Sequence, residues 1–203
     1  SVIMHEVGHN FFPMIVNSDE REHAWMDEGF NSFVQFLTEQ AWRENYPSRR
    51  GFPHKIAPFM GKDPDKQQPI ITNPEYQPEI GNVIYGKTAT ALNILRETVM
   101  GRELFDYAFR EYAQRWAFRN PYPADFFRTM EDASGMDLRW FWRGWFYSTD
   151  FVDQSLEKVE LFRLADKNNP ELPAAKIDDA ALPQYQTNKS IESKIVPRQD
   201  IEK

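Results

Sequence analysis

The chain has 203 residues, a formal net charge of −7 and no cysteine. This length is enough for one substantial domain, or for one domain followed by a tail. The charge gives no sign of a nucleic-acid partner, the lack of cysteine excludes disulfides and thiolate-bound metals, and no apolar run reaches the roughly 20 residues of a membrane span.

The first forty residues predict two helices separated by a polar turn. The first helix covers residues 2–12, and the polar, charged residues 17–23 form the turn. The second helix covers residues 27–43, with Asp27 as its N-cap, so that Glu28 lies rigidly in its first turn. Apolar side chains are expected on the buried face of the first helix: Ile3, Val7 and either Phe11 or Met14.

Residues 46–81 differ in character, because seven of the fourteen prolines fall there. This composition predicts an ordered but irregular connection with a short helix near residues 54–60. The segment forms either one wall of a cleft or a simple crossing of the surface.

Helical periodicity returns after residue 81. Further helices are predicted at residues 82–100, at 102–118, from Pro123 to Gly135, and from Asp137, which caps the last one. The 82–100 helix has a continuous apolar stripe, made of Ile84, Thr88, Ala91, Leu92, Leu95 and Val99. The aromatic series at 140–147 is expected in the core rather than at a ligand.

These patterns predict a mainly α fold with five or six helices over residues 1–150. Residues 151–203 are expected to form an edge strand within 156–164, followed by an extended linker or tail that is rich in proline and polar residues.

Two histidines four residues apart define a metal-binding pattern near the N-terminus. On one helix, His5 and His9 differ by about 40° in direction and about 6 Å along the axis, so both imidazoles can reach one ion. Glu28 follows after 18 intervening residues and supplies the third ligand of a catalytic zinc, which keeps its fourth position open. Glu6 is the candidate base that takes a proton from the zinc-bound water. The alternative is an amphipathic helix with two surface histidines.

The segments His5-Glu6-Val7-Gly8-His9 and Trp25-Met26-Asp27-Glu28-Gly29-Phe30, with the gap between them, resemble the M1 family of zinc metallopeptidases, relatives of aminopeptidase N and leukotriene A4 hydrolase. Thermolysin-type endopeptidases are a weaker match, because their gap and the sequence around the glutamate differ. The resemblance extends from residue 2 to about 149. It implies the helical half of a thermolysin-like, or gluzincin, catalytic domain holding one Zn²⁺.

The resemblance also implies a tyrosine that stabilises the oxyanion, within a Tyr-x-Lys-Gly pattern at the head of a helix. The stretch Ile84-Tyr85-Gly86-Lys87-Thr88-Ala89 is similar to it, so Tyr85 is the candidate. Two positions depart from the pattern: Gly86 replaces a larger polar residue, and Thr88 replaces a common glycine. A tyrosine that simply belongs to the core is the alternative.

Three other polar residues have simpler interpretations. His23 and His54 complete the set of four histidines, and the metal set needs neither of them, so His23 is expected to face solvent. Asp27 either caps its helix or supports the neighbouring ligand Glu28. Gly8, a poor helix former, is expected to allow close packing near the metal.

The expected function is zinc-dependent hydrolysis of peptide bonds in a peptide or protein substrate, with release of N-terminal amino acids. The alternative is a zinc-binding scaffold or interaction module without turnover. The choice of aminopeptidase over endopeptidase rests on the resemblance alone, because the Gly-x-Met-Glu-Asn loop by which the family holds the substrate amine is absent from these residues.

The active-site helix begins within four residues of the first residue, so the chain is expected to be a fragment whose partner is a missing N-terminal part of the parent protein. A dimer through exposed apolar surface is a second expectation. Export to a bacterial periplasm is expected from the resemblance only, and no residue of the chain indicates it.

Overall fold

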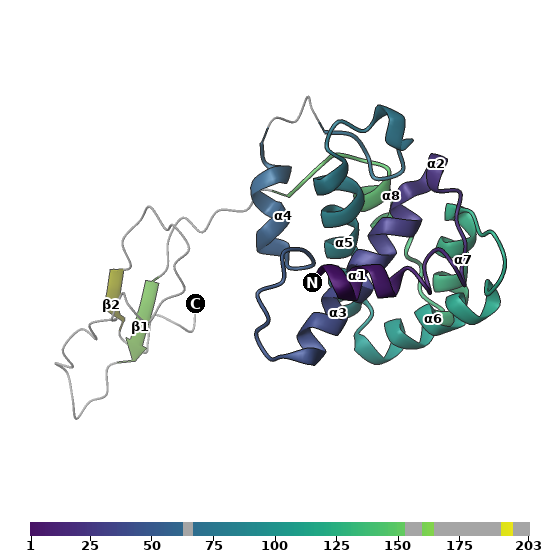
Figure 1. The fold of residues 1–203 in the computed structure, drawn as a ribbon. Coiled ribbons are helices and arrows are strands. Elements are labelled where there is room, and N and C mark those ends of the chain that lie inside the picture. Colours follow the sequence, from purple (N-terminus) through teal and green to yellow (C-terminus); the bar gives the residue numbers. More distant parts are fainter. Residues whose placement is uncertain (63–66, 153–159, 165–191, 197–203) are drawn as a thin grey trace. The chain divides into compact units, whose positions relative to one another are not determined.

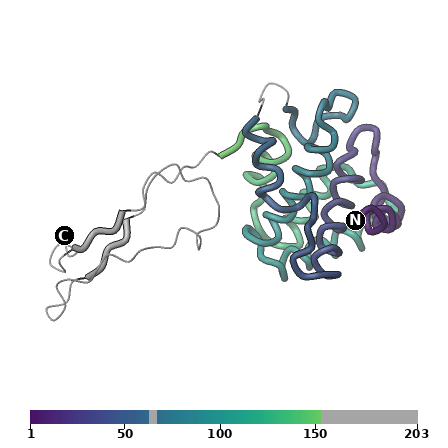
Figure 2. Tube along the Cα trace, turned by 60° about the vertical axis from the view of Figure 1, so that its left-hand side comes forward, coloured from purple at the N-terminus to yellow at the C-terminus, as the bar shows by residue number. Residues whose placement is uncertain are grey.

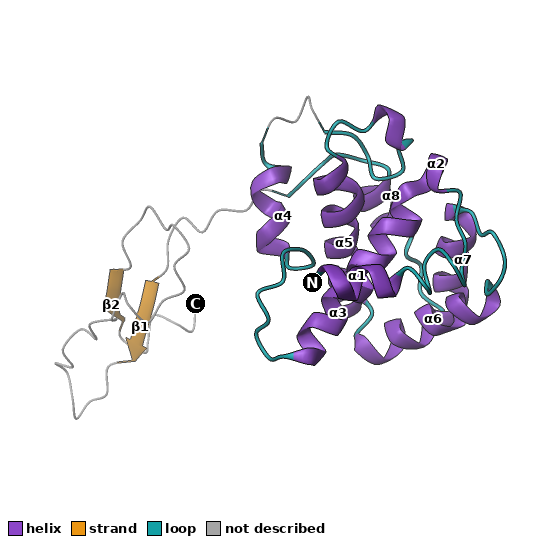
Figure 3. Cartoon of the chain, viewed as in Figure 1, coloured by secondary structure: helices purple, strands orange, loops and turns teal. Residues whose placement is uncertain are grey.

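The computed structural model describes residues 1–62, 67–152, 160–164 and 192–196 (Figure 1). The chain divides into two compact units, Ser1–Phe151 and Val152–Lys203. Within the described residues, all regular structure of the first unit is helical, and that of the second is a pair of strands (Figure 3). The prediction of a mainly α fold is therefore confirmed.

The described part of the first unit contains α-helices, wider π-helical segments and one 3₁₀ turn, and Figure 2 follows the chain through them. In chain order, they are α1 (Val2–Gly8), α2 (Glu20–Ala24), the π-helical η1 (Trp25–Gly29), α3 (Phe30–Trp42), α4 (Pro53–Met60), the 3₁₀ turn η3 (Pro74–Tyr76), the π-helical η4 (Gly81–Lys87), α5 (Thr88–Ile94), the π-helical η5 (Leu95–Val99), α6 (Arg102–Arg115), α7 (Pro123–Ser134) and α8 (Arg139–Phe146).

The helix that carries Glu28 is longer than predicted. Elements α2, η1 and α3 follow one another in the chain, but His23 interrupts them with a kink, since its φ of −131° and ψ of 49° are not helical. The predicted N-cap role of Asp27 is wrong, because this residue lies inside η1. The predicted polar turn at 17–23 includes the first residues of α2. The residues of α2 lie outside the core, and Glu20 and Glu22 suit the first turn of this short helix. Glu28 therefore lies in the π-helical middle of the rod instead of at its beginning.

The buried face of α1 also differs from the prediction. The helix ends at Gly8, and Gly8 packs so closely against α3 that an added Cβ would overlap the side chain of Asn31. This confirms the close packing expected at Gly8. Since that contact turns the Gly8 side of the helix inward, the apolar side chains expected to be buried are between 55% and 80% exposed: Ile3, Val7, Phe11 and Met14.

An aromatic core holds the Glu28 segment in place. Phe30, two residues further on, is completely buried, and its ring centroid lies 4.7 Å from that of Phe126. Trp25, three residues before Glu28, is 1% exposed and packs against Phe30. Each such ring contributes about 1.5–3 kcal/mol by burial. The carboxylate of Glu28 is thus attached to one of the most firmly packed parts of the backbone.

The remaining helices largely follow the sequence pattern. Helix α4 covers the short helix predicted near 54–60, and η4, α5 and η5 together cover 82–100, with all of the predicted apolar stripe buried except the half-buried Val99. Gly135 ends α7 with φ 68°, as expected of a C-terminal glycine. In the described part of the first unit, these elements form seven helical segments, the second of them kinked at His23, against the five or six expected.

The last helix begins one residue later than predicted. Leu138, not Asp137, precedes α8, although the Asp137 carboxylate accepts a hydrogen bond from the backbone N–H of Arg139 (3.1 Å). The aromatic series in and after this helix is divided between core and surface. Phe141, Trp142 and Phe146 are buried, while Trp140 is exposed.

The described residues of the second unit are two strands, β1 (Glu160–Leu164) and β2 (Glu192–Val196), paired in parallel with Glu160 opposite Glu192. Strand β1 matches the predicted edge strand, whereas β2 falls in the predicted tail. The rest of that tail, 165–191 and 197–203, lies outside the described residues. Among the residues that the structure describes, no helix combines the length and apolarity needed to cross a bilayer.

Candidate metal centre

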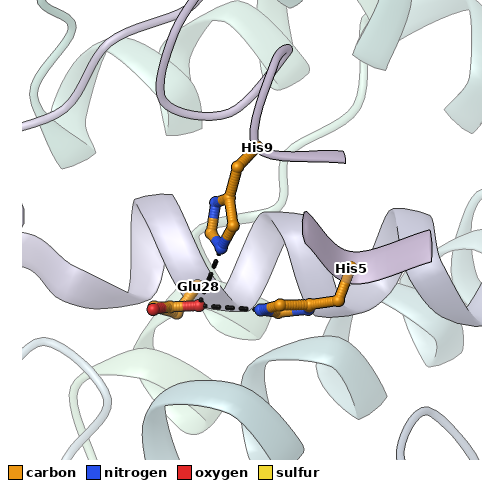
Figure 4. Close-up of side chains that lie close together, drawn as sticks. All are labelled: His5, His9 and Glu28. Atoms are coloured by element: carbon orange, nitrogen blue, oxygen red, sulfur yellow. Dashed lines mark hydrogen bonds and ion pairs between the residues drawn. The ribbon is translucent and has the colours of Figure 1, made fainter. Parts of the chain in front are cut away.

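Two helical elements bring three of the predicted site residues together (Figure 4). His5 lies on α1, His9 is the residue that ends this helix, and Glu28 lies in η1. Oε2 of Glu28 is 3.0 Å from Nε2 of His5 and 3.4 Å from Nε2 of His9. One donor atom from each residue lies within 4.8 Å of the other two.

The other ring nitrogens are held by hydrogen-bond partners. Nδ1 of His5 lies 2.9 Å from Oε1 of Gln35, and Nδ1 of His9 lies 2.8 Å from the carbonyl oxygen of Phe12. Both partners are acceptors, so each Nδ1 carries the proton and donates it. Each Nε2 then presents a lone pair toward the carboxylate of Glu28.

Two imidazole lone pairs and a carboxylate oxygen fit a zinc ion. Zinc takes these donors at about 2.0–2.2 Å in a tetrahedron, which places neighbouring donors about 3.3 Å apart. The two spacings from Glu28 to the histidines agree with this edge length. Three protein donors also leave one tetrahedral position open, as catalytic zinc sites do.

Asp27 lies beside His9 rather than at a helix end. Its side chain is buried, and Oδ1 lies 3.1 Å from Nδ1 of His9. Because the Nδ1 proton points at Phe12, this close contact is not a hydrogen bond. Burial and the neighbouring Glu28 carboxylate raise the pKa of Asp27 to about 7, and His9 acts in the opposite direction. The carboxyl of Asp27 thus supports the His9 side of the centre.

Tyr85 reaches the centre from η4. Its ring stacks near that of His5, with 6.0 Å between the centroids and 28° between the planes. Burial, and the Glu28 carboxylate beside its hydroxyl, raise the pKa of Tyr85, so its O–H remains a donor at neutral pH. The guanidinium carbon of Arg50 lies over the Tyr85 ring, 4.4 Å from its centroid.

Glu6 is exposed on α1, next to His5. Among the described residues it forms no hydrogen bond or ion pair, so its carboxylate is available to solvent.

The remaining histidines lie elsewhere. His23 is half-buried, its ring contacts Tyr122 edge to face with centroids 6.2 Å apart, and its Nδ1 is buried without a hydrogen bond. The prediction that His23 faces solvent is therefore wrong, because its ring packs against Tyr122. His54 is exposed on α4 and stacks on Phe52.

Three contributors to the site were not predicted from the sequence: Gln35, Asn31 and Arg50. Gln35 follows Glu28 by seven residues, about two helical turns, so helical spacing could have predicted that it lies on the same face as Glu28. Asn31 donates from Nδ2 to the carbonyl oxygen of His5 (2.8 Å), and Arg50 comes from the loop after α3; local patterns predict neither contact.

Comparison with known proteins assigns the fold and its family. The family model described as "Peptidase family M1 domain" matches residues 1–145. Glutamyl aminopeptidase of Sus scrofa is 28% identical over 145 residues, which is 68% of this chain and 15% of that protein. Aminopeptidase N of Lactococcus lactis subsp. lactis is 22% identical over 167 residues, covering 78% and 20% of the two chains.

The fold is also that of solved structures. An M1 zinc metallopeptidase mutant from Deinococcus radiodurans, bound to a Tyr-Ser-Ala substrate, superposes with a TM-score of 0.63 at 17% identity, over 75% of this chain and 34% of that one. The chain spans between 15% and 20% of the length of the curated relatives named above. Since the family model covers most of the chain, the chain belongs to peptidase family M1.

Proposed function

We propose that this chain carries the zinc-binding, catalytic helices of a metallopeptidase that hydrolyses peptide bonds and releases N-terminal amino acids. The observation that carries the proposal is the convergence of His5, His9 and Glu28, whose donor atoms all lie within 4.8 Å of one another. The names of the relatives, glutamyl aminopeptidase and aminopeptidase N, support the N-terminal specificity.

Each residue has a role that follows from its position. His5, His9 and Glu28 hold the metal, which when bound supplies Lewis-acid polarisation of the scissile carbonyl and lowers the pKa of a water molecule. Glu6, adjacent to His5 and free of other partners in the described structure, takes the proton and returns it to the leaving amine. The Tyr85 hydroxyl donates to the carbonyl oxygen as its negative charge develops.

The test is hydrolysis of an alanyl arylamide by the zinc-loaded chain, and by any longer protein that contains it. Glu6→Gln keeps the size of the side chain but removes the base, and it should lower kcat by about 10²–10⁴-fold while zinc content is unchanged. Glu44→Gln, at an exposed position outside the centre, is the matched control. An active Glu6→Gln variant would refute the proposed role of this residue.

A second substrate tests the N-terminal specificity. The N-acetylated form of the same arylamide lacks a free amine and should be hydrolysed at least about tenfold more slowly if the amine is recognised through a charged contact. Equal rates on both substrates would identify an endopeptidase-like site instead.

A further inference from the structure

A cavity of about 460 Å³ lies beside Tyr85, between the loop after α3, helix α4 and the first turns of η4. Residues of the proline-rich segment form most of its lining, which favours the interpretation of this segment as the wall of a cleft over that of a simple surface crossing. Among the residues that the structure describes, three cationic side chains line the cavity, Arg49, Arg50 and Lys55, against a single carboxylate, that of Glu79. The Glu79 carboxylate already accepts a hydrogen bond from Asn82 (2.9 Å). The cavity is therefore an electropositive pocket.

Arg50 connects this pocket with the metal centre. Its guanidinium carbon is 4.4 Å from the centroid of the Tyr85 ring, and that ring is 6.0 Å from the ring of His5. The guanidinium of Arg50 is therefore no further from the His5 ring than the length of about three residues of extended peptide, at roughly 3.3–3.6 Å per residue. A peptide whose scissile bond lies at the metal centre can thus place a group in the cavity.

The charge on Arg50 lacks a direct counter-ion in the part of the chain that the structure describes, where no carboxylate lies within ion-pair distance of it. Burial lowers the pKa of Arg50, while Tyr85 and Glu28 act in the opposite direction at longer range. A partly desolvated guanidinium gains most from an anion that can accept two parallel hydrogen bonds, as a carboxylate does.

Gly86 keeps the cavity open next to Tyr85. An added Cβ at this position would lie 3.3 Å from Cδ1 of Ile56, and the next atom, the backbone oxygen of Gly81, would be at ordinary contact distance. Position 86 is also where the chain departs from the larger polar residue of the pattern that it resembles. Because Gly86 has no side chain, the space in the pocket stays open and the cationic side chains that line it are not covered from this position.

We propose that this cavity is a substrate subsite that binds a carboxylate of the peptide, with Arg50 as its main contact and Lys55 and Arg49 at its rim. The inference rests on the proposed peptidase function and adds a specificity to it. The carboxylate comes either from an acidic side chain or from the C-terminus of a short peptide.

Binding is measured by calorimetry with the zinc-loaded Glu6→Gln chain, so that turnover does not interfere. The probes are trialanine amides with one glutamate at each position in turn, the same peptides with glutamine, and trialanine as its free acid. At least one anionic probe should bind about tenfold more tightly than its neutral counterpart. A glutamate peptide in that role identifies the side chain as the source, and the free acid identifies the C-terminus.

Two variants assign the effect to the cavity. Arg50→Gln should abolish the preference for the anionic probe, whereas Arg110→Gln, which removes an exposed arginine on α6, should leave it intact. Gly86→Glu should abolish the preference, and Gly86→Gln, which fills the same space without charge, should retain part of it. The Gly86 pair decides the question if Arg50→Gln does not fold.

The outcomes separate this inference from the proposed function. Equal binding of anionic and neutral probes overturns the subsite, even if the wild type hydrolyses neutral substrates. A preference that disappears in Arg50→Gln and Gly86→Glu supports the subsite even if the wild type shows no turnover, in which case only the peptidase assignment fails. A preference that persists in both variants places the anion elsewhere and overturns the inference.

Discussion

Gly8 on α1 lies directly against the side chain of Asn31 on α3, and Asn31 donates a hydrogen bond to the carbonyl oxygen of His5. Asn31 is completely buried and follows Glu28 by three residues. The helix of the two histidines is thus attached to the rod of the third ligand through a glycine and an amide, neither of which is a ligand. The spacing of the three donor atoms depends on this contact.

Gly8→Ala should therefore damage both stability and metal binding. The new methyl group overlaps Asn31, so either the amide moves and the bond to His5 is lost, or the two helices separate. We expect a loss of about 1–3 kcal/mol in the free energy of unfolding, and a decrease in zinc affinity of at least about tenfold. Urea denaturation and titration against a chelating indicator measure the two effects.

Gly144→Ala is the matched control, because a Cβ there meets nothing within 4 Å and the position lies in exposed helix. It should leave zinc affinity unchanged and stabilise the chain by about 0.5–1 kcal/mol. If Gly8→Ala behaved like Gly144→Ala, the Gly8 contact would have no part in positioning the ligands.

Zinc stoichiometry is the most direct test of the donor set. The native chain should hold about one zinc, and His9→Ala and Glu28→Ala should each lose it, because two protein donors no longer define a tetrahedral site. His54→Ala, which removes an exposed histidine of α4, should keep the metal. Elemental analysis after dialysis decides between these results, and zinc retained by either ligand variant would place the ion elsewhere.

The metal pattern could be predicted from sequence because it is local. Four-residue spacing on a helix fixes the relation between His5 and His9 wherever the helix packs. The orientation of α1 could not be predicted in the same way. Periodicity placed Ile3 and Val7 inside, but the small Gly8 lets α3 approach and so decides which side is buried. A contact between distant residues overrode the local hydrophobic pattern.

The extent of the Glu28 rod shows the same limit. The residues of α2 are polar and give no helical signal of their own. The kink at His23 separates most of them from the segment that Trp25 and Phe30 anchor, and that segment is held by packing from α7 and α8. The contact of Arg50 with Tyr85 joins residues 35 positions apart and has no counterpart in any local pattern.

Tyr85→Phe tests the role of the hydroxyl alone. The phenylalanine ring can keep the stacking near His5 and the contact with Arg50, so zinc content and folding should not change. We expect kcat to decrease by about 10²–10³-fold with little change in KM, as for the removal of one oxyanion donor. Steady-state kinetics measures this effect, and Tyr107→Phe, which changes an exposed tyrosine of α6, is the control variant. Full activity of Tyr85→Phe would mean that the phenol is only a packing group.

Lys87 should make stability depend on pH. Its side chain is buried, Nζ donates to the carbonyl oxygen of Ser148 (3.3 Å), and burial lowers its pKa to about 8 from an ordinary value of 10.5, with Asp150 acting in the opposite direction. Below pH 8 the lysine is charged in both the folded and the unfolded chain, and the folded state bears the full cost of a buried cation. Between pH 8 and 10.5 only the unfolded chain binds the proton, so stability should rise with pH.

Lys87→Met removes that cost. At pH 7 the variant should be more stable by up to about 3 kcal/mol, reduced by the cost of leaving the Ser148 carbonyl without its donor, about 1 kcal/mol. The advantage over the wild type should shrink through pH 8–10.5, as measured by urea denaturation at closely spaced pH values. Lys55→Met, at an exposed position, should show no such window. A difference between Lys87→Met and the wild type that stayed constant from pH 7 to 10.5 would mean that Lys87 keeps its proton in the folded state and that the hydrogen bond to Ser148 compensates for its burial.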